Sequence, residues 1–148
     1  MHISDIISPE CILCGVDCHS KKDALDTLAK TIANSDSATS QTEVFDCLIA
    51  RERLGSTGLG KGIAIPHGRL KQSKKTLAAF LQLETAIDYD AVDKQPVDLL
   101  FALIVPEEST EEHLQTLAKL AEMFSNKSII KKLRQASTAE EIYSILTG

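Results

Sequence analysis

Residues 97–105 read VDLLFALIV, and this stretch decides the fold class that the sequence predicts. A nearly continuous apolar run is typical of a central strand buried on both faces, and Pro106 predicts where the strand ends. Two further strands are predicted at 77–84, LAAFLQLE, and at 63–65, IAI, which Pro66 ends. Helical patterns precede and follow these strands, so we expect an α/β protein whose mixed sheet is sandwiched between helices on both faces.

Five helices are predicted from start signals and from apolar residues at helical spacing. Ser20, Ser40, Ser109 and Thr138 each precede an acidic residue by three positions, a pattern typical of helix N-termini. A shorter helix is predicted at 127–135. The residues that we expect to face the core are Ala24, Leu25, Leu28, Ala29 and Ile32 in the first helix, Val44, Phe45, Leu48 and Ile49 in the second, Leu114, Leu117, Ala118, Ala121 and Phe124 in the third, and Ile142, Ile145 and Leu146 in the last.

The composition is that of a soluble globular protein. The chain has 148 residues, of which 43% are hydrophobic, so we expect one domain spanning 1–148 with an ordinary core. A net charge of −5 argues against a broad nucleic-acid surface, which needs clustered basic residues. The longest apolar run, 99–105, is too short to span a bilayer, so we expect no membrane insertion. The N-terminus shows no signal-peptide pattern, and we expect a cytoplasmic protein.

Three of the four cysteines, Cys11, Cys14 and Cys18, lie in the segment CILCGVDCH, which ends at His19. This spacing is compatible with zinc or an iron–sulfur cluster. No second ligand pair completes the usual arrangement, and Cys11 and Cys14 bracket a predicted buried strand, where free cysteine is a common apolar filler. Cys47, alone in a predicted helix, has the same interpretation. We expect no metal and no cofactor, and a role for the cysteine segment stays open.

Residues 55–69 read GSTGLGKGIAIPHGR, and their start comes within one position of the nucleotide-binding phosphate loop, G-x-x-x-x-G-K-[ST]. Gly62 stands where that loop needs a hydroxyl for magnesium. A phosphate loop also joins a strand to a following helix, whereas here a predicted helix enters the segment and a strand leaves it. We therefore reject nucleotide hydrolysis. The glycines favour either a flexible turn or a backbone whose N–H groups approach a ligand closely.

Side chains around the glycines could handle phosphate. His67 follows a proline, which restricts the backbone, and neutral imidazole can act as a nucleophile. Arg51 lies on the inward side near the end of its helix, where it is either snorkelling or aimed at an anion. His113 lies in the first turn of its helix, where the dipole favours an anion. Ser56 and Thr57 add hydroxyl donors. Spacing in the sequence does not by itself show that these residues meet.

The segment RERLGSTGLGKGIAIPHGR, 51–69, resembles the active-site signature of the fructose/mannitol-type enzyme IIA proteins of the bacterial phosphoenolpyruvate-dependent phosphotransferase system. The stretches QPVDLLFALIVPEESTEEHLQTLAKLAEMF and LRQASTAEEIYSIL are similar to that family too, so the resemblance covers nearly the whole chain. The segment GSTGLGKGIAIPHGRL is most similar to the nitrogen-related, regulatory branch of the family. The segment CILCGVDCH is not part of the family signature.

The resemblance implies a fold, a reaction and a donor. The implied fold is a mixed sheet between helices on both faces. His67 is the implied phosphoryl acceptor, forming a tele-phosphohistidine, with Arg51 and His113 beside it. Donors near Ser56 and Thr57 would stabilise the transferred oxygens. The implied donor is a small histidine phosphocarrier protein, and no magnesium ligands are expected for a histidine-to-histidine exchange.

Because donor and acceptor are both proteins, we expect a shallow site ringed by apolar residues, with Leu59 and Leu70 as candidates. The leading hypothesis is a phosphotransfer protein whose phosphorylation state regulates partner proteins. The alternatives are a component that passes phosphate to the B domain of a sugar transporter, and a binding module without phosphotransfer. Phosphorylation adds negative charge at the docking site, so we expect the two forms to bind different targets.

Overall fold

One strand in the middle of the chain organises the sheet. The strands in chain order are β1 (Ile12–Val16), β2 (Gly58–Gly60), β3 (Ile63–Ala64), β4 (His67–Leu70), β5 (Leu77–Ile87) and β6 (Val97–Pro106). β5 runs antiparallel along one edge of β6, and β3 and then β4 run parallel along the other. β1 lies parallel beside β5, and β2 lies antiparallel beside β3. The mixed sheet and the central place of β6 are as predicted.

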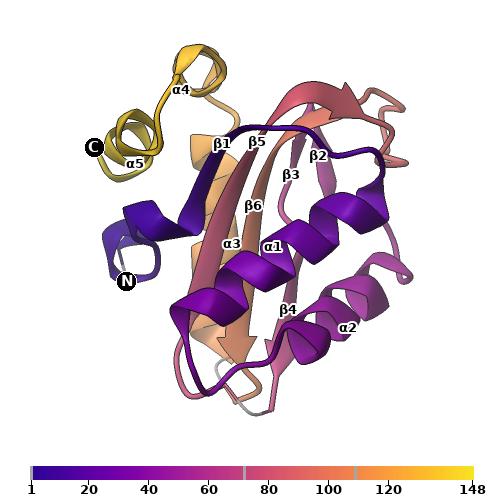
Figure 1. The fold of residues 1–148 in the computed structure, drawn as a ribbon, viewed down its shortest axis with the longest axis vertical. Coiled ribbons are helices and arrows are strands. Elements are labelled where there is room, and N and C mark those ends of the chain that lie inside the picture. Colours follow the sequence, from indigo (N-terminus) through magenta and orange to yellow (C-terminus); the bar gives the residue numbers. More distant parts are fainter. Residues whose placement is uncertain (1, 72, 109) are drawn as a thin grey trace.

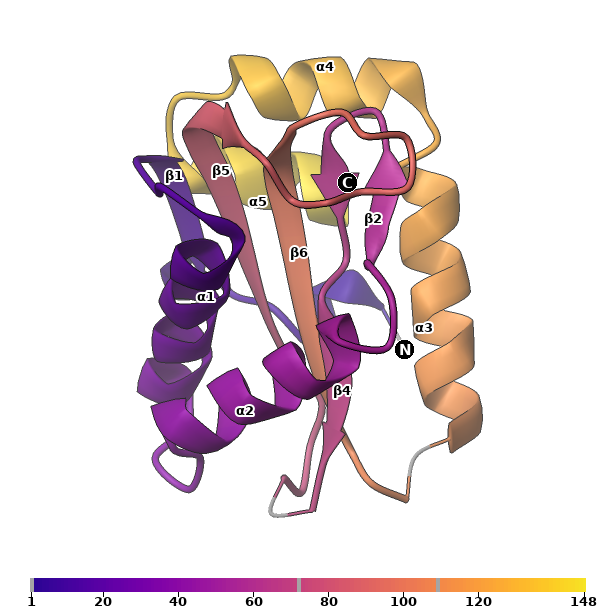
Figure 2. The same cartoon turned by 90° about the vertical axis from the view of Figure 1, so that its right-hand side faces the viewer.

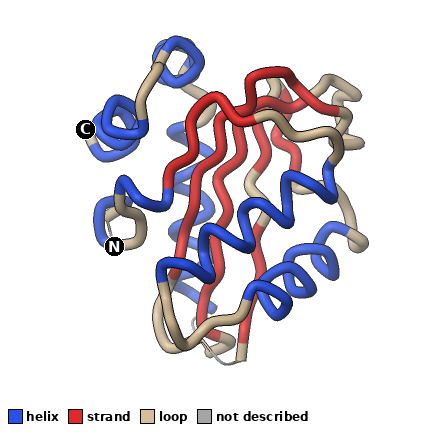
Figure 3. The backbone as a smooth tube through the Cα atoms, viewed as in Figure 1, coloured by secondary structure: helices blue, strands red, loops and turns tan. Residues whose placement is uncertain are grey.

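Helices cover both faces of this sheet, as predicted. They are α1 (Lys21–Ser35), α2 (Gln41–Glu52), α3 (Thr110–Met123), α4 (Lys127–Gln135) and α5 (Ala139–Thr147), with short 3-10 turns η1 (Ile3–Asp5) and η2 (Pro9–Cys11) near the N-terminus. α1 and α2 lie on one face and α3 lies on the opposite face (Figure 1). Figure 2 shows α1 and α3 on opposite sides of the strands, and Figure 3 shows the strands enclosed by helices.

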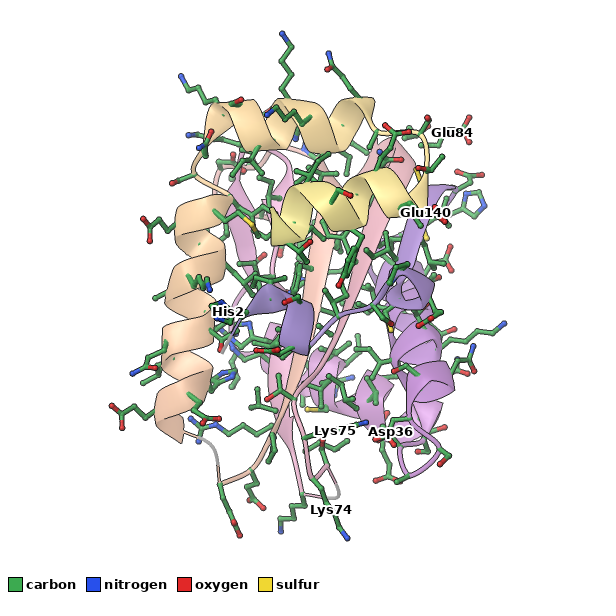
Figure 4. All side chains as sticks on the ribbon, turned by 90° about the vertical axis from the view of Figure 1, so that its left-hand side faces the viewer. His2, Asp36, Lys74, Lys75, Glu84 and Glu140 are labelled. Carbon is green, nitrogen blue, oxygen red and sulfur yellow. The ribbon has the colours of Figure 1, made fainter. Side chains whose placement is uncertain are left out.

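The structure describes residues 2–71, 73–108 and 110–148. Within these ranges no helix has both the length and the apolar character needed to cross a membrane. The buried apolar residues form one cluster, which includes side chains of every helix. Many charged side chains lie at the surface: those of Lys74, Glu84 and Glu140 point away from the sheet when the molecule is seen from the side of α4 and α5 (Figure 4).

Three of the four predicted helix starts are confirmed by side-chain caps. The hydroxyls of Ser20, Ser40 and Thr138 each accept the backbone N–H three residues later, at 3.1 Å in every case. These bonds satisfy donors that the first turn of a helix leaves unpaired. The fourth predicted cap, Ser109, lies outside the described residues.

The predicted core face is right for α1 and only partly right for α3, of whose predicted residues Leu117 and Phe124 contact the core. The whole predicted stripe of α1 is 0% exposed. In α3, however, His113, Thr116 and Leu120 are buried, whereas Leu114 is 63% exposed and Ala118 is also exposed. The buried face is therefore displaced by one residue, about 100° around the helix. The apolar pattern could not predict this, because two of the buried positions are polar.

The cysteines of the segment 11–19 lie in different surroundings. Cys11 is buried at the end of η2, Cys14 donates from Sγ to Gln82 Oε1 at 3.0 Å, and Cys18 Sγ lies 3.7 Å from the hydroxyl of Thr27. All are free thiols, and burial raises the pKa of Cys14 and Cys18. In the described part of the chain, no group of three or more His, Cys, Asp or Glu side chains is arranged to hold a metal ion.

Two glycines with positive φ offer a matched test of the turn that precedes β3. Gly15 (φ 65°) and Gly62 (φ 83°) both occupy the left-handed region. A Cβ at Gly62 would also collide with the guanidinium of Arg134 and lie 2.9 Å from Asp98 Oδ1, whereas nothing lies within 4 Å of a Cβ at Gly15. Arg134 and Asp98 form an ion pair at 2.9 Å.

We therefore expect Gly15→Ala to lower the free energy of unfolding by about 1 kcal/mol, the cost of the left-handed conformation alone. Gly62→Ala should lower it by roughly 2 kcal/mol or more, because the ion pair must also move. Urea unfolding of the two variants measures both losses. Equal losses would contradict the predicted displacement of Arg134.

Candidate active site

His67 is anchored to the central strand through the backbone. It is the first residue of β4 and lies opposite Leu103 of β6. The preceding Pro66 has no N–H, but its carbonyl accepts the N–H of Leu103 at 2.9 Å. Pairing with β6 thus continues from β3 to β4 past the proline. The strand β4 was not predicted from the sequence, which suggested only that the chain is rigid at this point.

The ring of His67 has two nitrogens with different surroundings. Nδ1 lies 2.6 Å from the carbonyl oxygen of Ile65. A carbonyl oxygen can only accept, so the hydrogen of the neutral ring is assigned to Nδ1, which leaves the lone pair on Nε2. Burial lowers the pKa of His67, and the charge of Arg51 lowers it further, against the raising effect of the bond to Ile65. The ring is therefore an uncharged nucleophile at neutral pH.

His113 lies beside His67. The two ring centroids are 5.5 Å apart, and the planes are tilted by 48°. Burial, then the neighbouring His67 and Arg69, lower the pKa of His113 to about 4, so its ring is neutral at pH 7. Its Nδ1 is buried and has no hydrogen-bond partner among the described residues. A buried ring nitrogen without a partner is costly, and a ligand oxygen or proton donor could satisfy it.

Arg51 reaches the same place from the last turn of α2. Its Nη1 donates to the carbonyl of Gly55 at 2.9 Å, which folds the side chain back over the loop after the helix. A guanidinium has five N–H donors, so most of them remain for another acceptor. The only permanent positive charge among these three side chains thus lies next to two neutral histidines, which suits an anionic group.

These three side chains line one hollow, and a second, smaller hollow shares two of them. The larger hollow, about 710 Å³, is lined by Glu43, Asp46, Cys47, Ala50, Arg51, Leu54, His67, Gly68, Arg69, Leu70 and His113. The smaller, about 240 Å³, is lined by Arg51, Ser56, Thr57, Gly58, Leu59, Ile65, His67, Leu117 and Ala121. Arg51 and His67 border both. The structure therefore brings together the three residues that sequence spacing could not place.

The two hydroxyl residues lie at the smaller hollow but differ in what they offer. Ser56 Oγ accepts the N–H of Gly58 at 3.1 Å, which leaves its hydroxyl hydrogen for a ligand. Thr57 is buried, and its hydroxyl donates to the carboxylate of Glu52. In this arrangement Thr57 has no side-chain hydrogen left for a phosphate oxygen, contrary to the role expected for it as a hydroxyl donor.

The expected apolar rim is only partly right. Leu59 is 49% exposed at the smaller hollow, whereas Leu70 lines the larger hollow but is only 7% exposed and belongs to the core. Leu54, 85% exposed beside the larger hollow, and Leu114, next to His113, are exposed instead. Leu70 faces inward because its neighbour Arg69 takes the outward position of the pleat.

Glu52 was missed by the sequence analysis although its spacing gave a signal. Val44, Leu48 and Glu52 recur every four residues along α2, and all three are buried. A carboxylate on the buried stripe of a helix needs a partner. Glu52 has one in Lys21, whose Nζ lies 2.7 Å from Oε1. Tyr89, fully buried nearby, was also missed.

The order of elements around the glycines differs from that of a nucleotide loop. α2 enters the segment, and β2 and β3 leave it as an antiparallel pair. No helix N-terminus follows the glycines to hold phosphates. The sequence-based rejection of the nucleotide loop therefore agrees with the structure.

His113 should make stability depend on pH. In the unfolded chain its pKa returns to about 6.5, whereas in the folded chain it is about 4. Between these two pKa values the unfolded state binds more protons than the folded state. The free energy of unfolding therefore falls as the pH drops from about 6.5 towards about 4. We expect the titration of His113 to lower the free energy of unfolding by about 2 kcal/mol between about pH 7.5 and about pH 5.

The variant His113→Gln does not titrate in this range. Its free energy of unfolding, measured in urea at both pH values, should decline less than that of the wild type by about the same 2 kcal/mol. A decline as steep as that of the wild type would contradict the low pKa of His113.

The chain is similar to known proteins over nearly its whole length. The sequence profile of the family described as phosphoenolpyruvate-dependent sugar phosphotransferase system, EIIA 2, matches residues 5–148. A nitrogen regulatory protein of Klebsiella oxytoca is 45% identical over 148 residues, covering 99% of this chain and 91% of the relative. The crystal structure of nitrogen regulatory protein IIA-Ntr from Neisseria meningitidis matches with a TM-score of 0.93 and 44% identity, over 98% of this chain and 99% of that one.

A solved structure of lower sequence identity has a similar fold. IIA mannitol from Escherichia coli has a TM-score of 0.80 at 22% identity, covering 95% of this chain and 98% of that one, and this similarity supports the fold alone. The family profile and the relatives cover nearly the whole chain. This chain therefore belongs to the EIIA type 2 family of the phosphoenolpyruvate-dependent phosphotransferase system.

Proposed function

We propose that this chain, acting as a single domain over 1–148, accepts a phosphoryl group on Nε2 of His67 from a histidine phosphocarrier protein. One observation carries the proposal: Nδ1 of His67 is held 2.6 Å from the carbonyl of Ile65, and Nε2 is left as the free nitrogen. This nitrogen belongs to a ring that borders both hollows, next to Arg51. Membership of the EIIA family makes the chain a phosphotransferase component that carries phosphohistidine.

The transfer requires no proton to move on this chain. The phosphorus–nitrogen bond of the donor phosphohistidine breaks, and its electron pair returns to the donor's ring. A new bond forms from Nε2 of His67 to the phosphorus. The ring of His67 becomes positively charged, and its Nδ1–H keeps the hydrogen bond to Ile65, which stabilises the product. Because a similar bond breaks and forms, the exchange is readily reversible.

Arg51 and His113 take complementary parts in this reaction. In the transition state, negative charge is spread over the three equatorial oxygens of the phosphoryl group. The free N–H groups of Arg51 can bind two of them, and the neutral ring of His113 can bind a third. The hydroxyl of Ser56 supplies a further donor at the smaller hollow. The carboxylates Glu43 and Asp46 also line the larger hollow.

We infer that the phosphorylation state of His67 regulates protein partners in the cytoplasm, in connection with nitrogen metabolism. The full-length similarity to proteins named nitrogen regulatory protein, at 45% identity, supports this role over sugar delivery. The alternative of phosphate delivery to a transporter's B domain has a direct test. Phosphorylated chain is mixed with the isolated B domain of a fructose transporter, and rapid loss of label from His67 to that domain would favour sugar delivery.

Removal of His67 tests the acceptor. The chain is incubated with labelled phosphoenolpyruvate, enzyme I and the phosphocarrier. The wild type should gain a label that is stable in base and labile in acid, as phosphohistidine is, and His67→Ala should gain none. The control is His19→Ala, because the side chain of His19 is 83% exposed and lies outside the hollows; it should be labelled like the wild type. Label on His67→Ala would reject His67 as the acceptor.

Replacement of Arg51 tests the role of its planar guanidinium. Arg51→Lys keeps the charge but loses the planar pair of donors, so the initial rate of labelling should fall by about 10- to 100-fold. Arg53→Lys is the matched control, since Arg53 is exposed two residues further on and borders neither hollow. A rate for Arg51→Lys equal to that of the control would show that charge alone suffices.

A further inference from the structure

A buried polar cluster lies behind the loop that joins α2 to β2. We name it the Glu52 cluster, and its members are Lys21, Glu52, Thr57 and Tyr89. They come from four separate parts of the chain: the start of α1, the end of α2, the loop before β2, and the segment after β5. None of them is one of the three side chains, His67, Arg51 and His113, to which the proposed mechanism assigns the transfer.

Glu52 is the centre of the cluster. It is 8% exposed, and its carboxylate accepts from Lys21 Nζ at 2.7 Å, from the backbone N–H of Thr57 at 3.2 Å, and from the Thr57 hydroxyl. Tyr89 is fully buried, with its hydroxyl 3.2 Å from that of Thr57. The ammonium of Lys21 also lies over the Tyr89 ring, 4.5 Å from its centroid. Every hydrogen bond within the cluster thus involves Glu52 or Thr57.

Thr57 connects the cluster to His67 in two steps. The carbonyl of Thr57 accepts the N–H of Ile65 at 3.1 Å. The carbonyl of Ile65 in turn lies 2.6 Å from Nδ1 of His67. Glu52 therefore fixes Thr57 by its backbone and its side chain, Thr57 fixes Ile65, and Ile65 fixes the ring and its tautomer.

The end of α2 does not need a buried polar cluster of this kind for its stability. A buried carboxylate paired with a lysine contributes little net stability, since removing both charges from water costs about as much as their attraction returns. An apolar residue at position 52 would continue the stripe of Val44 and Leu48. The bonds instead converge on Thr57, whose carbonyl supports the strand segment before His67.

We propose that the Glu52 cluster is a positioning device that holds the ring of His67 in the Nδ1–H tautomer and aims Nε2 at the incoming phosphoryl group. This proposal rests on the proposed role of His67 as the acceptor. Glu52 lines neither hollow, and Thr57, which lines the smaller one, donates its hydroxyl hydrogen to Glu52, so both would act through His67 as positioning residues. A misplacement of about 1 Å can slow a reaction of this kind by about 100-fold.

Thr57→Val tests the device because it removes the hydroxyl and keeps the shape. We expect the transfer rate at saturating phosphocarrier to fall about 10- to 100-fold, with little change in the phosphocarrier concentration that gives half the maximal rate. Nitrogen-15 NMR of the unphosphorylated chain should show a second tautomer of His67. Thr57→Ser, which restores the hydroxyl, should recover the rate and the single tautomer.

The matched control is Thr31→Val. Thr31 is also buried, at 9% exposed, and its hydroxyl donates to the carbonyl of Thr27 at 2.9 Å in the middle of α1. This variant loses the same group far from the loop. It should transfer phosphate at the wild-type rate and keep one His67 tautomer. A rate as low as that of Thr57→Val would show a general effect of lost stability and overturn the proposal.

A second variant covers the case in which Thr57→Val does not fold. Glu52→Gln keeps one oxygen for the Thr57 N–H but cannot accept from both groups of Thr57, and it should show the same loss of rate and the same second tautomer. A folded Thr57→Val or Glu52→Gln with the wild-type rate and one tautomer would overturn the proposal. The two proposals fail separately: absence of label on the wild type rejects phosphotransfer, whereas the NMR tautomer of the unphosphorylated chain still judges the positioning role.

Discussion

The pairing of β6 along both of its edges is the constraint from which the other elements take their places. β6 is buried on both faces along most of its length, so helices must cover both sides. Along one edge it meets a long antiparallel partner. Along the other it meets two short parallel segments, separated by a proline whose carbonyl still bonds to the strand. His67 lies directly after that interruption, on a backbone that pairs with the central strand.

The site assembles groups from elements of different kinds, and this explains its electrostatics. The sheet supplies His67, the end of α2 supplies Arg51, and the beginning of α3 supplies His113. Burial keeps both imidazoles uncharged, whereas the arginine keeps its charge at any physiological pH. In the proposed reaction, the result is an unprotonated nucleophile next to a cation that can hold the phosphoryl group. Neither property requires a bound metal ion in the proposed reaction.

The sequence predicted the architecture well because the signals are local. Caps at Ser20, Ser40 and Thr138 and the apolar run of β6 each depend on neighbouring residues. The failures arise where polar residues are buried. The inward face of α3 was displaced because His113 occupies a core position, and Glu52 was overlooked because a carboxylate was not expected on a buried stripe. Its partner Lys21 is distant in the sequence, so no local pattern could pair them.

The same contrast between local sequence signals and contacts of the folded chain applies to the site. His67, Arg51 and His113 could be named from the sequence, but their meeting depends on how α2, α3 and the sheet pack. The tautomer of His67 depends on one carbonyl two residues before it, a contact of the folded backbone that residue types do not specify. Leu70 lines the larger hollow, but its burial depends on strand β4 and its alternation, which were not predicted.

The larger hollow beside His67 is open to water, and exposed Leu54 lies at its border. A phosphoramidate in such a place is shielded only while a partner protein covers it. In the free chain, hydrolysis and transfer then compete for the same phosphoryl group. The phosphorylated form would have a finite lifetime set by the solvent exposure of the site, so the chain would report recent rather than accumulated supply of phosphate from its donor.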